Sequence, residues 1–90
     1  MAKLKLTDKI VTNTYEVAGH SEFFIDIVEN RYRHVWDAYL WHMSYGVKAR
    51  IFGSDTETLP LEGFKQVMLS GIEDDIKDYI EMYAPELLEG

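Results

Sequence analysis

The sequence predicts an α+β domain in which a four-stranded antiparallel sheet comes first and a C-terminal helix packs on one face. Segments rich in β-branched and aromatic residues fill 9–53, and apolar residues recur at helical spacing through 59–84. Ninety residues are enough for one domain with a single small core. We therefore expect one two-layer domain over 1–90, with an N-terminal segment at 1–8 and a frayed tail at 85–90.

Four strand-like segments make up the predicted sheet. They are KIVTNTYEV from Lys9, EFFIDIVEN from Glu22, HVWDAYLWHM from His34 and VKARIFG from Val47. The short breaks AGHS, NRYR and SYG separate them. Breaks of this length join antiparallel neighbours, so the pattern predicts a meander.

After SDTET the apolar period becomes helical. The residues that recur at steps of three and four are Leu61, Phe64, Val67, Met68, Ile72, Ile76, Ile80 and Tyr83. Thr58 is the expected cap, Pro60 suits the first turn, and Pro85 cannot continue the helix.

One point inside the helix stays open. Gly71 costs roughly 1 kcal/mol in a helix interior. Ser70 precedes Glu73 by three residues, which is the spacing of a capping box. The segment is therefore either one helix or two helices broken near Ser70 and Gly71.

The strand HVWDAYLWHM carries bulky side chains at both odd and even positions, so they would point to both faces of the sheet. If Tyr45 and Gly46 form a two-residue hairpin loop, Leu40 faces Ile51 and Trp41 faces Arg50. In the preceding hairpin Ile25 would face Ala38. The helix then covers one face of the sheet. The opposite face collects the predicted interaction residues Phe24, Tyr39, Trp41, Met43, Arg50 and Phe52.

The same register places Asp26 opposite Asp37. Like charges in direct pairing are destabilising. Either the register differs from this one, or each carboxylate meets a cation. No pocket residues accompany the pair, so we expect two solvated strand acids and no acid–base site.

A single helix cannot cover both faces of the sheet, so the aromatic face needs another explanation. A homodimer could pack sheet on sheet, or the domain could cover the face itself with Leu4 and Leu6, or with Leu87 and Leu88. A different protein could also bind there, because Trp, Tyr, Met and Arg are enriched at interfaces. Single-stranded nucleic acid stacking on the aromatics is the fourth alternative.

The net charge of −7 is unevenly distributed. Residues 1–52 carry +1 and residues 53–90 carry −8. In IEDDIKDYIEMY the helical period gathers an outward acidic stripe of Asp74, Asp78 and Glu81. Such a stripe either improves solubility or attracts a basic partner such as a nucleic-acid-binding protein, and its charge repels nucleic acid itself.

No pattern indicates catalysis, a cofactor or a metal. The chain lacks cysteine, a GxSxG motif, a glycine-rich phosphate loop and an EF-hand loop. His34 and His42 would lie about 26 Å apart along one strand, too far to share a metal. The sequence therefore predicts a protein without enzymatic activity.

Localisation follows from similar observations. MAKLKLTDK contains lysines but no apolar core of a signal peptide, and no apolar run approaches the ~20 residues that span a bilayer. The lack of cysteine agrees with a reducing compartment. We expect a cytoplasmic protein without membrane contact.

Together these patterns predict a small acidic protein-interaction module that binds a protein partner or itself, as a homodimer, through the aromatic sheet face. The alternatives are an acidic, phage-type inhibitor that mimics nucleic acid at a host enzyme, and a single-strand nucleic-acid binder. Strands followed by the helix start TLPLEGF resemble small bacterial and phage regulatory domains in outline, a likeness of fold alone.

Overall fold

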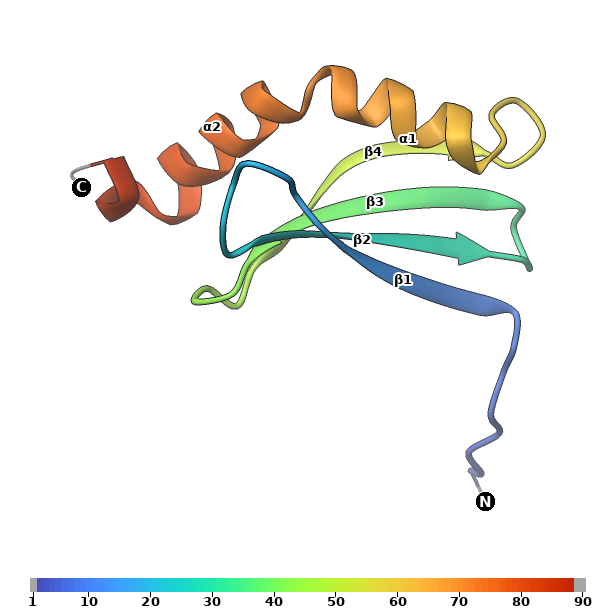
Figure 1. Ribbon diagram of the computed structural model, residues 1–90. Helices are drawn as coiled ribbons and strands as arrows, with labels where there is room; N and C mark the ends of the chain where they lie inside the picture. Colours follow the sequence, from blue (N-terminus) through green and yellow to red (C-terminus); the bar gives the residue numbers. More distant parts are fainter. Residues whose placement is uncertain (1, 89–90) are drawn as a thin grey trace.

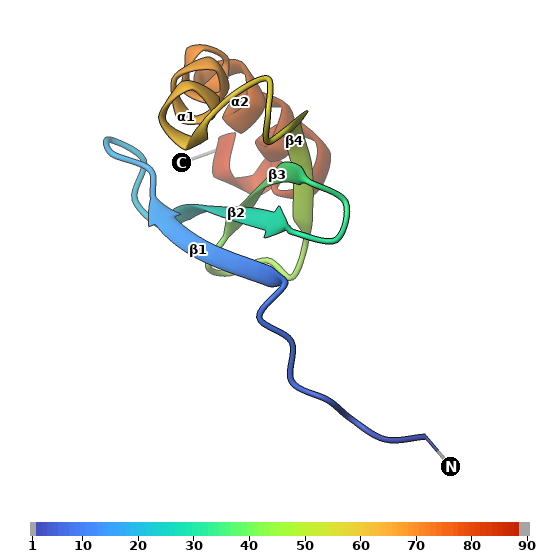
Figure 2. The same ribbon diagram turned by 90° about the vertical axis from the view of Figure 1, so that its right-hand side faces the viewer.

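The computed structural model describes residues 2–88 and confirms the α+β fold (Figure 1). The elements are β1 (Ile10–Glu16), β2 (Phe23–Asn30), β3 (Val35–His42), β4 (Lys48–Asp55), α1 (Leu61–Ser70), α2 (Ile72–Tyr83) and the 3-10 helix η1 (Pro85–Leu88). The strands form one antiparallel sheet in the order β1-β2-β3-β4, the predicted meander. Figure 2 shows α1 and α2 on the same side of this sheet.

The register of the last hairpin differs from the predicted one. Residues 43–47 connect β3 to β4, and the Tyr45 backbone N–H donates to the His42 carbonyl (3.1 Å), so the predicted two-residue loop is wrong. Leu40 consequently faces Ala49 instead of Ile51, and Trp41 faces Lys48 instead of Arg50. The shift at these positions is by two residues. Because side chains alternate with a period of two, Leu40 and Trp41 keep their predicted faces.

The hairpin between β2 and β3 is shifted in the same way. Its connection spans 31–34, where the Asn30 side-chain oxygen accepts the backbone N–H groups of Tyr32 (3.0 Å) and Arg33 (3.1 Å). Ile25 therefore faces Leu40, not Ala38. The longer connection displaced the pairing and left the two faces of the sheet as predicted.

A bulge in β4 moves one aromatic residue to the helix side. Ala38 faces Phe52 while Tyr39 faces Arg50, which leaves Ile51 as the extra residue. An extra residue interrupts the alternation of side chains along a strand. Phe52 packs against Phe64 of α1, with ring centroids 4.9 Å apart. Its predicted place on the outer aromatic face is therefore wrong.

The core lies between the sheet and the helices. Its buried residues are Val17, Phe23, Ile25, Ile27, Ala38 and Leu40 from the sheet side, and Phe64, Met68, Ile72, Ile76 and Tyr79 from the helices. Two hydrogen bonds tie the layers together: Trp36 Nε1 donates to the Leu59 carbonyl (2.8 Å), and the Tyr79 hydroxyl donates to the Val47 carbonyl (2.7 Å). The polar ends of these two rings are thereby satisfied in the packed interior.

The helix breaks at Gly71, as one of the two alternatives predicted. The Ser70 hydroxyl donates back to the Val67 carbonyl (2.5 Å), and Gly71 is the N-terminal cap of α2, so the capping-box interpretation is wrong. The start of α1 also differs from the prediction. Pro60 occupies the cap position, while Thr58 donates its backbone N–H (2.6 Å) and hydroxyl (2.9 Å) to the Asp55 carboxylate.

The two ends of the described chain behave differently. Pro85–Leu88 form η1 against α2, so the expected fraying is wrong for these residues, while residues 89–90 of the predicted tail lie outside the described residues. Residues 2–8 extend away from the domain on the side opposite the helices (Figures 1 and 2). Leu4 and Leu6 are almost fully exposed, so they do not cover the sheet within this chain. No helix in the described chain is long and apolar enough to span a membrane.

The bulge predicts that truncating Phe52 lowers the free energy of unfolding much more than truncating Met43 does. Phe52→Ala should lower the free energy of unfolding by about 2 kcal/mol or more, because Phe52 packs on buried Phe64. Met43→Ala, at an exposed position, should stay within about 0.5 kcal/mol of wild type. Urea unfolding followed by circular dichroism measures both, and equal small losses would contradict the inward placement of Phe52.

Candidate functional site

The face of the sheet that no helix covers is the candidate site, and we call it the outer face. Phe24, Tyr39, Trp41 and Arg50 of the predicted interaction set lie on it, because Phe24 pairs with Trp41 and Tyr39 pairs with Arg50. Met43 directly follows β3 and is 61% exposed. Five of the six predicted residues thus gather around this face, and Phe52 does not.

Asp26 lies at the centre of the outer face and is only 5% exposed. Its carboxylate accepts hydrogen bonds from Thr14 Oγ1 (2.7 Å), Trp41 Nε1 (3.0 Å) and Lys48 Nζ (2.7 Å). These donors come from β1, β3 and β4, and Asp26 itself belongs to β2. One carboxylate therefore links all four strands on the side away from the core.

The surroundings of Asp26 favour its ionised form. Burial is the strongest single influence and opposes ionisation, but the hydrogen bonds from Lys48, Thr14 and Trp41 and the Lys48 charge together outweigh it. The pKa of Asp26 is therefore below its ordinary value. At neutral pH the outer face contains a fixed, fully hydrogen-bonded anion.

An aromatic stack lies beside this anion. The Phe24 and Trp41 rings are 4.6 Å apart with an interplanar angle of 21°, and Lys48 Nζ lies 4.9 Å from the centroid of Trp41. The ammonium group thus contacts the indole and the Asp26 carboxylate together. Phe24 and Trp41 form a preorganised apolar surface next to the exposed Met43.

The predicted pairing of Asp26 with Asp37 is wrong. Asp37 faces Val28, and its carboxylate accepts Arg50 Nε at 2.7 Å. Gly53 leaves the space for this ion pair, because a Cβ at that position would lie 2.0 Å from an Arg50 guanidinium nitrogen. Asp26 and Asp37 therefore each have their own cation, Lys48 and Arg50.

The histidines form no metal site. His42 is buried between Phe23 and Tyr45, and its Nδ1 accepts the Ser44 backbone N–H at 3.0 Å. His20 Nε2 lies 2.9 Å from the Glu73 carboxylate. Within residues 2–88 no three His, Cys, Asp or Glu side chains are grouped closely enough to hold a metal ion.

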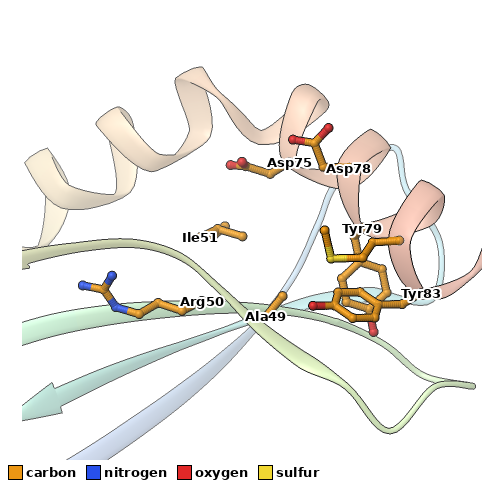
Figure 3. A pocket seen from close by; sticks show the side chains of 8 residues that line it. Ala49, Arg50, Ile51, Asp75, Asp78, Tyr79 and Tyr83 are labelled. Carbon is orange, nitrogen blue, oxygen red and sulfur yellow. The ribbon is translucent and has the colours of Figure 1, made fainter.

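The acidic stripe of Asp74, Asp78 and Glu81 lies exposed on α2. The structure adds Asp75, which sequence reasoning left out of the stripe. Asp75 and Asp78 border a cleft of about 310 Å³ between α2 and β4, which Ala49, Arg50, Ile51, Tyr79, Met82 and Tyr83 also line (Figure 3). We call this the acidic cleft. Burial, then the charges of Asp78 and Asp74, raise the pKa of Asp75.

A second cleft of about 380 Å³ lies between α1 and β1. Tyr15, Ile25, Ile27 and Met68 are among its lining residues, and it includes Lys65. Lys65 Nζ lies 5.2 Å from the centroid of the Tyr15 ring and 3.0 Å from the Glu62 carboxylate. The second cleft also includes Glu16 and Glu62. Among residues 2–88, Asp75 and Asp78 of the acidic cleft have no ion-pair partner, whereas Glu16 is the one such carboxylate of the second cleft.

Comparisons with family models, curated proteins and solved structures found no match to this chain.

The hydrogen bonds to Asp26, which we call the Asp26 network, predict that the stability difference between wild type and Asp26→Asn depends on pH. Asp26→Asn should lower the free energy of unfolding by about 1–3 kcal/mol at pH 7, because Lys48 loses its buried partner. Since the pKa of folded Asp26 lies below the unfolded value, this contribution is present above the unfolded pKa and is lost as pH falls through the folded pKa. Urea titrations at pH 7 and pH 3 should show the penalty shrinking in acid. A penalty that grows in acid would contradict the network.

Proposed function

We propose that this protein is a non-enzymatic protein-interaction module that self-associates by packing the outer faces of two copies together. The observation that carries the proposal is the apolar surface of Phe24, Trp41 and Met43 on a sheet face that neither helix covers. In a two-layer domain such a face is stabilised when a second layer packs on it.

The composition of the outer face supports this proposal. Trp, Tyr, Met and Arg are the residues enriched at the centres of protein interfaces, and Trp41, Tyr39, Met43 and Arg50 are all present. The Trp41 ring is fixed by Phe24, Lys48 and Asp26, so little side-chain freedom would be lost when a partner packs on it.

The distribution of charge favours a second copy as the occupant. Residues 53–90 carry −8 and include both helices, whereas residues 1–52, which hold most of the sheet, carry +1. Packing two outer faces together would place the acidic helices on opposite sides of the dimer. The nearly neutral sheets would meet, and repulsion between the helices would be weakest in this arrangement.

The pairing of charges on the outer face favours protein over nucleic acid. Lys48 and Arg50 already bind Asp26 and Asp37, so phosphates would have to compete with carboxylates that are fixed in place.

Two substitutions on the outer face test the proposal. Met43→Glu and Trp41→Glu should each convert a dimer into a monomer, with the dimer dissociation constant raised at least about 100-fold, because a carboxylate would be buried between the sheets. Light scattering after size exclusion measures the mass. Val67→Glu, at an exposed position on α1, is the matched control and should remain dimeric.

Circular dichroism separates dissociation from unfolding, and Met43→Glu keeps the Asp26 network intact. A wild type that is monomeric at every concentration would overturn the proposal. So would a Met43→Glu variant that is as dimeric as the Val67→Glu control.

The unpaired acids of α2 support a second candidate function, an inhibitor that mimics nucleic acid at a basic enzyme site. Among residues 2–88, Asp74, Asp78 and Glu81 have no ion-pair partner, and all three are exposed. Exposed carboxylates without cations can substitute for phosphates in a basic groove.

A displacement assay tests this second function. The protein should release a labelled oligonucleotide from a sequence-nonspecific DNA-binding protein at low salt and lose this effect as salt is raised. The triple variant Asp74→Asn, Asp78→Asn, Glu81→Gln should release it at least about tenfold less effectively. Equal release by the triple variant and by wild type would exclude a role for the stripe.

A further inference from the structure

Residues 2–8, which we call the basic arm, lie extended and leave the domain on the side away from the helices (Figures 1 and 2). Lysine and leucine alternate in the arm as Lys3, Leu4, Lys5 and Leu6. Leu4 and Leu6 have the highest fractional exposure of the large apolar side chains in the described chain. A strand with this alternation presents a cationic side and an apolar side.

The acidic cleft offers complementary groups. Asp75, Asp78, Tyr79, Met82 and Tyr83 follow one stripe of α2, and they border the outer edge of β4 (Figure 3). Within residues 2–88 neither Asp75 nor Asp78 has an ion-pair partner, because Arg50 of the same cleft binds Asp37. Burial and, after it, the charges of Asp78 and Asp74 raise the pKa of Asp75, and no ion pair in the described chain offsets these charges.

The edge of β4 supplies the backbone groups that an added strand needs. β4 is the last strand of the order β1-β2-β3-β4, so its outer edge has no neighbour in the described chain. An extended segment beside such an edge gains main-chain hydrogen bonds, and alternate side chains point to the two faces of the sheet.

We infer that the basic arm of each copy adds as a fifth strand to the outer edge of β4 in a second copy of this chain. Lys3 and Lys5 then point to the helix side and bind Asp75 and Asp78. Leu4 and Leu6 point to the other side, between the two outer faces. This inference rests on the proposed self-association and names the segment that completes it.

The dimensions agree with this arrangement. Lys3 and Lys5 would be about 6.8 Å apart along a strand, close to the 5–6 Å between helical positions three residues apart, such as Asp75 and Asp78. Seven arm residues reach about 23 Å, more than the ~10 Å between packed sheets. A twofold axis parallel to the strands would place β1 of one copy across from β4 of the other.

The arm also supplies area that the outer face lacks. Four strands about 4.8 Å apart and about 26 Å long give a flat footprint of roughly 500 Å² per copy. Further contact area would strengthen the dimer. Leu4 and Leu6, buried between the sheets, would add apolar area to the dimer. An exchanged arm therefore accounts for the exposure of the two leucines.

The edge of β1 is also unpaired in the described chain. The distribution of charge favours the edge of β4 as the place where the basic arm binds. The cleft beside β1 contains Glu16 and also Lys65, whose charge is paired with Glu62. In the described chain the cleft beside β1 has one carboxylate without an ion-pair partner, Glu16, whereas the acidic cleft has two, Asp75 and Asp78.

A charge reversal with rescue tests the inference. Lys3→Glu with Lys5→Glu should raise the dimer dissociation constant about tenfold or more, and Asp75→Lys with Asp78→Lys should do the same, because each change sets like charges together. The quadruple variant should regain affinity to within about threefold of wild type, since opposite charges then meet again. Sedimentation equilibrium measures the dissociation constant of each variant. Glu57→Lys, at an exposed position between β4 and α1 and outside the cleft, is the matched control and should differ from wild type by less than about threefold.

The failures of the two proposals are distinguishable. A quadruple variant that is as weak as its parents, or arm variants with wild-type affinity in a dimer that Met43→Glu still dissociates, would overturn the arm exchange alone. A wild-type chain that is monomeric at all concentrations would overturn the self-association and the arm exchange together. Arm substitutions lie outside the packed core, so circular dichroism should show unchanged folding.

Discussion

The hydrogen bonds to the Asp26 carboxylate organise the outer face of the sheet, because they hold Trp41 and Lys48 in place. They join one residue from each strand: Thr14 from β1, Asp26 from β2, Trp41 from β3 and Lys48 from β4. A carboxylate buried at a sheet surface is costly unless its oxygens are satisfied, and here all three donors are present. The network fixes the Trp41 ring, which then stacks on Phe24 and contacts Lys48.

The helix layer and the outer face of the sheet differ in the kinds of side chain that they present. The helices cover one face with apolar residues and carry much of the excess acid, whereas the outer face holds aromatic rings and paired charges. The helical segment is broken at Gly71, and α1 and α2 each bury apolar residues in the core. The uncovered face, the acidic cleft and the basic arm are the three features that the proposed dimer would bring together.

For β2 and β3 the sequence predicted which face of the sheet the side chains occupy, but not which residues they pair with. Alternation with a period of two assigned Leu40 to the core and Trp41 to the outer face, and a shift of two residues preserves that assignment. The partners depended on connection lengths, and the Tyr45–Gly46 turn was inferred from glycine alone. The bulge at Ile51 could not be foreseen, because no proline or glycine marks it, and Phe52 was misplaced as a result.

For the candidate site, too, the sequence predicted which aromatic residues share a face but not which groups come into contact. The aromatic members of the outer face followed from parity, but the role of Asp26 depends on three donors far apart in the sequence, whose meeting requires the actual register. Asp75 was missed because it lies between the outward stripe and the core, where only packing against β4 reveals the cleft. The excess of acid near the helices was evident from composition; the half-buried position of one acid was not.

The two indole N–H groups can report directly on whether the outer faces of two copies meet. Trp41 Nε1 donates to Asp26 on the outer face, and Trp36 Nε1 donates to Leu59 beneath the helices. In a dilution series of nitrogen-15 spectra, the Trp41 indole resonance should shift with protein concentration while that of Trp36 stays constant. A Trp41 resonance that does not move across the series, or a shift confined to Trp36, would contradict the account.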